Sequence, residues 1–171
     1  MLSLDNIGGV PAHPLLVHIP VVLVPLAFLL AVAALWKKFR SQLLLAAAIA
    51  AAVGGIGVLL AAGSGESLVG GVRDRADRQL LHDHTEKGDA AQAGAGIFAI
   101  VAIAAAGEEI LRRKHKLSKV PKWVPAVLLV GSVATGAVAT WMVFDAGHSG
   151  AKSAWNGVKA VGEGGERGGD D

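Results

Sequence analysis

The hydrophobic positions of this chain gather into long uninterrupted runs, which a soluble domain would not need. Charged residues are almost absent from four such runs, at residues 14–36, 43–62, 90–107 and 123–144. Each run approaches or exceeds the roughly 20 residues that a helix needs to cross about 30 Å of hydrocarbon. The pattern predicts an all-α protein, a bundle of four transmembrane helices.

Polar and glycine residues set the expected bounds of these helices. The third helix can begin well before its apolar run, because Leu80, Leu81 and His84 lie broadly on one face. The second helix should end near Gly63 and the fourth near Gly147. We therefore expect helices at about 14–36, 43–62, 78–111 and 123–146 in a membrane domain of residues 1–155. Residues 156–171 are Gly-rich and charged, and they should form a disordered tail.

The distribution of charge predicts the orientation. The first connection (37–40) is basic and has no acid, as is the third (112–122), whereas the second mixes both signs. The positive-inside rule therefore places these two basic connections in the cytoplasm and both termini outside. No Lys or Arg precedes the first run, so we expect it to be kept as a helix and not cleaved as a signal peptide. The expected location is a bacterial cytoplasmic membrane, with lipid and no nucleic acid as partner.

Prolines should shape the first helix. Pro20 and Pro25 each remove a backbone hydrogen bond, which tends to kink a helix. Pro14, His18 and Pro25 recur at helical spacing, so they share one stripe. We expect His18 to face the inside of the bundle, about one turn below the helix start.

Histidine is the side chain best placed for chemistry. His13, His18, His84 and His148 all fall at the predicted outer ends of the helices. The chain has no cysteine, which excludes disulfides, thiolate metal sites and covalent haem attachment. Polar rings close to hydrocarbon usually serve a function. A histidine-lined site near the outer face is therefore expected.

A b-type haem that passes electrons is the leading hypothesis. Two imidazoles from different helices could hold the iron across an apolar slot, and we predict His18 and His84 as the axial ligands. Gly88, one turn after His84, should leave space beside that ring. His13 or His148 could contact a propionate or serve as the other ligand. The possible cationic partners of the propionates are Arg73, Arg75 and Arg78.

Two alternatives to haem give these histidines another role. Zn or Cu could bind His18, His84, His148 and possibly His13, completed by a carboxylate of Asp83, Glu86 or Asp145. Alternatively, the chain is a structural accessory subunit whose histidines only form hydrogen bonds at the interface. His82 and His115 are expected to be surface residues, and His13 could simply cap a helix. No nucleophile–base arrangement is evident, so hydrolysis is disfavoured.

Three motifs resemble a bacterial membrane family, domain of unknown function 2231. They are GVPAHPLLVHIP (residues 9–20), HTEKGD (84–89) and GHSGA (147–151). The resemblance spans residues 8–155 and implies a four-helix integral membrane protein with outer-face histidines at His13, His18, His84 and His148. Some members of the family that this chain resembles are fused to Rieske iron–sulfur domains, so the resemblance implies a role in electron transfer. The redox partner here would then be a separate protein, such as a Rieske or cytochrome protein.

Overall fold

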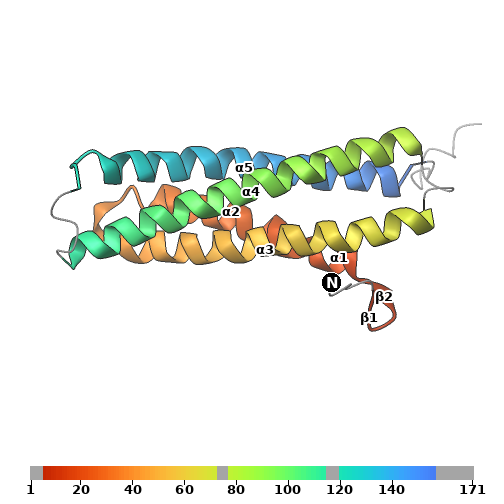
Figure 1. Cartoon of the computed structure of the whole chain (residues 1–171), viewed down its shortest axis with the longest axis horizontal. Coiled ribbons are helices and arrows are strands. Elements are labelled where there is room, and N and C mark those ends of the chain that lie inside the picture. The colour runs from red at the N-terminus through yellow and green to blue at the C-terminus, as the bar shows by residue number, and fades with distance from the viewer. Residues whose placement is uncertain (1–5, 73–76, 115–119, 157–171) are drawn as a thin grey trace, which may run out of the picture.

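The computed structural model describes residues 6–72, 77–114 and 120–156, and this part of the chain is almost wholly helical (Figure 1). Two short antiparallel strands come first, and a short 3-10 helix, Lys37–Phe39, precedes α3. The elements are β1 (Asn6–Ile7), β2 (Val10–Pro11), α1 (Ala12–Leu16), α2 (His18–Ala33), α3 (Arg40–Val72), α4 (Arg78–Arg113) and α5 (Val124–Ala154).

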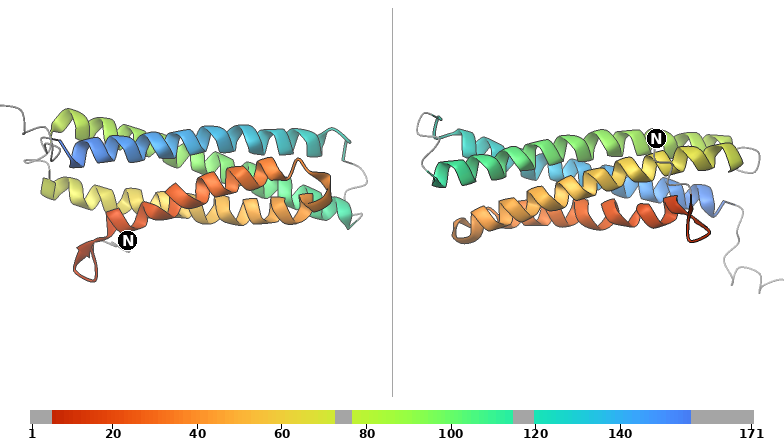
Figure 2. Two further views of the ribbon diagram at one scale, coloured as in Figure 1. Left: turned by 180° about the vertical axis from the view of Figure 1, so that it is seen from behind. Right: turned by 60° about the horizontal axis from the view of Figure 1, so that its bottom comes forward.

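The helices form an antiparallel bundle made of two halves (Figures 1 and 2). In the first half, residues 12–72, α1 and α2 run along α3; in the second half, residues 78–154, α4 runs along α5. Four helical stretches are long and apolar enough to span a membrane, which confirms the predicted number: Ala12–Ala33, Lys37–Val69, Arg78–Arg113 and Val124–Ala154. We call the end that carries His13 and His84 the histidine end, and the other the basic end.

Small residues fill the space between the helices. Ala47, Ala95 and Ala139 are buried, and Phe98 is the largest of the fully buried side chains. The large aliphatic side chains lie outside instead, as Ile100 does with 69% of its surface exposed. A bundle in lipid packs in this way, because small residues let backbones approach while large apolar ones face the acyl chains. The predicted close packing is therefore present.

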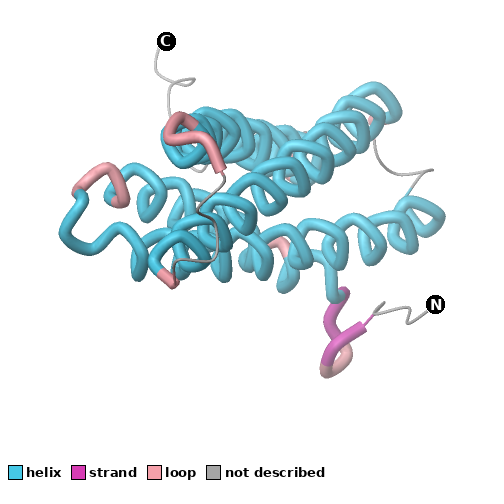
Figure 3. The backbone as a smooth tube through the Cα atoms, turned by 60° about the vertical axis from the view of Figure 1, so that its left-hand side comes forward, coloured by secondary structure: helices cyan, strands magenta, loops and turns pink. Residues whose placement is uncertain are grey.

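The first membrane segment is broken at Val17, earlier than predicted (Figure 3). Pro20 has no N–H to donate to the carbonyl of Leu16, so α1 ends there and α2 starts at His18. The helix α2 then continues through Pro25, where a kink was also expected. The break does not shift the buried stripe, because Leu16, Pro20 and Val24 are buried at four-residue spacing across it. The predicted stripe of Pro14, His18 and Pro25 lies on the opposite, more exposed side of the segment.

Helix ends also differ from the predictions. α3 continues past Gly63 to Val72, and α5 continues past Gly147 to Ala154. Asp77 caps α4, since its carboxylate accepts hydrogen bonds from the amides of residues 79 and 80. The unpredicted strands β1 and β2 pair through Gly8 and Gly9, whose φ values of 59° and 82° suit a tight hairpin turn. Most of the predicted tail lies outside the described residues.

Candidate functional site

His84 is held against α5. It lies on the second turn of α4, and its half-buried ring donates from Nδ1 to the carbonyl oxygen of Ala146 at 3.1 Å. The Ser149 hydroxyl donates to the same carbonyl at 2.9 Å and lies 3.2 Å from Nδ1. Gly150 makes room for the ring, because a Cβ atom there would lie 2.8 Å from Cε1. The inward direction predicted for His84 is confirmed.

His13 is held against α3 in the same way. Its half-buried ring lies on α1 and donates from Nδ1 to the carbonyl oxygen of Ala61 at 2.7 Å. The Ser64 hydroxyl donates to that carbonyl at 2.9 Å. A Cβ atom on Gly65 would lie 3.0 Å from the Nδ1 atom of His13. Each half therefore supplies one histidine, one shared carbonyl, one buried serine and one glycine.

The two rings lie next to each other at the histidine end. Their centroids lie 6.1 Å apart, and their planes stand at 80°. A carbonyl oxygen can only accept, so Nδ1 carries the proton in both rings. When the rings are neutral, each Nε2 keeps its lone pair. Two fixed imidazole donors thus lie close together, one from each half.

Many buried positions correspond between the halves. Residues of α2 and of the turn after it are buried at the same spacing after His13 as residues of α4 after His84. These buried residues are Pro20, Val24, Ala27, Ala31 and Ala34 in the first half and Ala91, Ala95, Phe98, Ala102 and Ala105 in the second.

Buried positions of α3 and α5 correspond likewise, at equal distances from Ala61 and Ala146. They are Leu44, Ala47, Ala51, Gly54, Val58 and Ser64 in α3, and Leu129, Ser132, Gly136, Ala139, Val143 and Ser149 in α5. The bundle is an internal repeat of one two-helix unit, and the histidine pair lies between the two copies.

His18 is not brought to this site, so the prediction that it faces inward is wrong. Its ring is exposed and donates from Nδ1 to the carbonyl oxygen of Pro14, one turn back in the same segment, at 2.7 Å. Leu16, Pro20 and Val24 form the buried stripe of this segment, and His18 lies on the opposite side of the helix. The structure thus pairs His84 with His13, not with His18.

His148 and His82 also lie away from the pair. His148 is exposed and stacks on Phe144, with ring centroids 6.4 Å apart. His82 is exposed, as predicted, and its Nε2 lies 3.4 Å from a carboxylate oxygen of Glu86. His115 lies outside the described residues.

A third protein ligand is missing from the described part of the site. No group of three or more His, Cys, Asp or Glu that could hold a metal ion occurs among the described residues. Asp83 and Asp145 contact Lys87 instead, each at 3.2 Å from its Nζ. Gly88 does not accommodate the ring of His84, because a Cβ atom there would have nothing within 4 Å. The expected His–carboxylate cluster is not assembled.

Arginine was the predicted partner of haem propionates. Arg73 and Arg75 lie outside the described residues, and Arg78 is the exposed first residue of α4. Lys87, three residues after His84 on α4, contacts Asp83 and Asp145.

Ser64 and Ser149 were missed as site residues, because each has an ordinary explanation as a turn or packing residue. One sequence signal could have revealed them. The segments AAGSG (61–65) and AGHSG (146–150) share the pattern Ala-x-x-Ser-Gly, and each follows an apolar run. Searching for an internal repeat would have aligned them and paired His13 with His84.

The model of the family DUF2231, described as a predicted membrane protein, matches residues 9–162 of this chain. The chain belongs to this family. The match covers both halves of the bundle and the histidine pair, and it confirms the resemblance found in the sequence. Searches among curated proteins and among solved structures give no match.

Proposed function

We propose that this protein binds one b-type haem between His13 and His84 and transfers electrons in the membrane. The observation that carries the proposal is the pair of neighbouring imidazoles, whose centroids lie 6.1 Å apart and which come from equivalent positions of the two halves. The haem iron would exchange one electron between its two oxidation states. The protein would set the reduction potential of the iron and its access to partners.

The separation of the rings suits a metal between them. Two metal–nitrogen bonds of roughly 2 Å each, together with the radii of two imidazole rings, bring the ring centres to about 6 Å. The carbonyls of Ala61 and Ala146 hold each Nδ1–H, leaving Nε2 as donor to the metal. Metal-binding histidines commonly have such a hydrogen bond behind them, which fixes the ring and raises its basicity.

Haem is favoured over zinc or copper by the number of ligands. A structural zinc site takes four protein ligands, and a catalytic one takes three. Haem needs only two from the protein, because the porphyrin supplies the other four nitrogens. The described residues offer two histidines and no larger cluster.

The equivalent positions of the two histidines also favour haem, because each half would offer the group one imidazole with the same hydrogen bond behind it.

The charge distribution supports an orientation with the histidine end outside. The described 3-10 helix at the basic end carries Lys37 and Lys38, and Arg112 and Arg113 end α4 there. Positive residues favour the cytoplasmic side, so the haem would lie near the extracytoplasmic face of a bacterial cytoplasmic membrane, with both termini outside. A separate Rieske or cytochrome protein is the class of redox partner we expect.

The visible spectrum of the purified protein in detergent tests this proposal. We expect a Soret band, and sharp reduced bands after dithionite, at about one haem per chain. His13→Ala should lower the haem content at least tenfold, while the matched change His18→Ala in the next turn should leave it unaltered. A colourless preparation from haem-replete cells would refute haem binding, and metal analysis of that sample would then test for zinc or copper. Loss of haem in His18→Ala alone would refute the ligand pair.

A further inference from the structure

The β1–β2 hairpin, residues 6–11, carries apolar side chains that the bundle does not bury. Ile7 and Val10 pair across the two strands, and 43% and 50% of their surfaces are exposed. Directly opposite residues project from the same face of a hairpin, so these two side chains form one apolar patch. Figures 1 and 2 show that the hairpin projects to the side of the bundle near α1, not along its long axis.

The equivalent segment of the second half is a helix. When the halves are aligned on His13 and His84, residues 6–11 correspond to residues 77–82. Those residues form the cap and the first turn of α4, which follows the long axis of the bundle (Figure 1). Exposed Ile7 corresponds to exposed Arg78. The sideways course and the apolar patch are therefore not required by the packing that the two halves share.

The two halves bracket the depth of the hairpin in the membrane. The apolar span of the first half begins at Ala12, directly after β2. The apolar run of the second half begins at Ala90, and His84, which lies beside His13, is about 9 Å further out at 1.5 Å per residue. The headgroup layer on each side of a bilayer is roughly 5–8 Å thick. The hairpin therefore lies within this layer or at its edge.

Lipid covers the surface that the hairpin joins. Leu15 of α1 and Val22, Leu26 and Leu29 of α2 are exposed and follow one another at helical spacing. No Asp, Glu, Lys or Arg occurs in residues 6–36. The hairpin thus extends an uncharged surface that faces the acyl chains.

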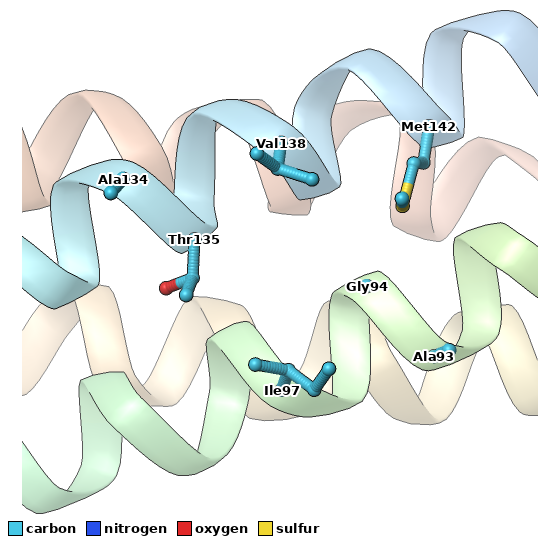
Figure 4. A pocket seen from close by; sticks show the side chains of 7 residues that line it. All are labelled: Ala93, Gly94, Ile97, Ala134, Thr135, Val138 and Met142. Carbon is cyan, nitrogen blue, oxygen red and sulfur yellow. The ribbon is translucent and has the colours of Figure 1, made fainter.

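The outer surface of the second half is also apolar. An apolar groove of about 310 Å³ runs between α4 and α5, lined by residues such as Gly94 and Ile97 (Figure 4). The hydroxyl of Thr135, which lines it, donates to the carbonyl oxygen of Gly131 at 2.7 Å and so is satisfied within its own helix. The lateral surface therefore suits lipid in both halves, whereas the hairpin belongs to the first half.

The backbone of the hairpin needs water nearby. Its two strands form a two-stranded sheet, so each leaves N–H and C=O groups unpaired on its outer edge. Hydrocarbon would leave these groups unsatisfied. Water alone would leave the apolar patch exposed, and an isolated two-stranded hairpin is only marginally stable in water. The headgroup layer provides water for the backbone and acyl chains for the side chains.

We propose that the β1–β2 hairpin is an interfacial anchor that binds the lipid surface at the histidine end. Ile7 and Val10 would insert toward the acyl chains while the backbone stays among the headgroups. The contact is apolar, because residues 6–11 include no charged side chain to select a headgroup. The anchor would hold α1, a helix of five residues, at a fixed depth, and it does not depend on haem.

A fluorophore attached to single cysteines of the full chain tests the depth, because the natural chain has no cysteine. Ile7→Cys and its matched control Arg78→Cys are labelled with NBD and placed in nanodiscs of phosphatidylcholine brominated near the glycerol end of its acyl chains. We expect bromine to quench NBD at residue 7 at least threefold more than at residue 78. Equal quenching would overturn the proposal. Blue-shifted emission at residue 7 without quenching would also overturn it, because protein and not lipid would then cover the hairpin.

A second variant separates the native side chains from the fluorophore. With NBD on Asn6→Cys, the double change Ile7→Ser and Val10→Ser should lower quenching about threefold. Glu66→Ser, at an exposed position of α3, should not change it. Both changed side chains of the hairpin are exposed, so the bundle core is left intact. Unchanged quenching in the double variant would mean that the fluorophore alone enters the lipid, and would overturn the proposal.

Discussion

The first half presents His13 from a helix of five residues, whereas the second half presents His84 from a helix of 36 residues. Both rings nevertheless receive the same support, a carbonyl with its serine and a glycine one residue further on. The residues that contact the two histidines are therefore of the same kind in both halves. The helices that carry these histidines differ in length.

Filling the glycine notches should have the largest effect. Gly150→Leu and Gly65→Leu would push His84 and His13 out of line, and we expect at least a tenfold loss of haem per chain in either variant. Gly63→Leu is the control, because a Cβ atom there meets nothing within 4 Å. Pyridine haemochrome absorbance measures the content. Normal haem in both site variants would refute the haem site, and normal haem in only one of them would break the equivalence of the two halves.

Replacing a large core side chain by alanine tests how the packing of the two halves differs. Phe98 stands where the first half has Ala27, and Phe98→Ala should lower the free energy of unfolding by about 3 kcal/mol through the cavity that it leaves. Titration with SDS from mild detergent, followed by circular dichroism, measures the change. Phe144→Ala, at an exposed ring, serves as control. A loss of unfolding free energy smaller than that of the control would mean that the second half closes the cavity and packs around alanine, as the first half does around Ala27.

Removing the serine hydroxyls should have a smaller effect. Ser64→Ala and Ser149→Ala each remove one hydrogen bond to a carbonyl that keeps its histidine donor, which costs about 1 kcal/mol. We expect haem to stay bound in both and the reduction potential to shift in the same direction, since the carbonyl then interacts more strongly with Nδ1–H. Opposite shifts in spectroelectrochemical titrations would contradict the equivalence.

The smallest effect concerns a contact that only the second half has. Lys87 bridges Asp83 of α4 and Asp145 of α5, whereas its counterpart Leu16 is buried and apolar. Lys87→Leu should lower the thermal midpoint slightly at low salt. The difference should vanish at high salt, because salt screens exposed charges. A loss that persists at high salt would point to packing of the Lys87 stem instead.

Acid should release the haem, because it protonates the histidine of either half. A histidine binds metal only when its nitrogen is unprotonated, so protons compete with the iron and haem content should fall as the pH is lowered. Absorbance of the Soret band during an acid titration measures this. Retention of haem in His13→Ala at every pH would show that the first half is not needed.

Long apolar runs made the four spans and the helical bundle predictable, because a chain in hydrocarbon must satisfy its backbone hydrogen bonds internally and a helix does so within one segment. The direction of His18 was not predictable from a helical count, because the count shows that Pro14 and His18 share a stripe but not which side of an all-apolar helix faces the core. The buried side proved to be that of Leu16, Pro20 and Val24. His13 was underrated because its partner carbonyl on Ala61 comes from a distant segment. Glycines near residue 63 suggested a helix end, yet α3 continues there and packs against the ring of His13.

Surplus helix length has a consequence for how the protein meets others. α3, α4 and α5 have 33, 36 and 31 residues, and their apolar runs leave roughly ten residues of each beyond the hydrocarbon at the histidine end. At 1.5 Å per residue these extensions rise about 15 Å above the membrane core. A water-soluble protein could therefore dock beside the histidine pair without inserting into the bilayer. The side chains on these helix extensions would then set the distance for electron transfer between the two proteins.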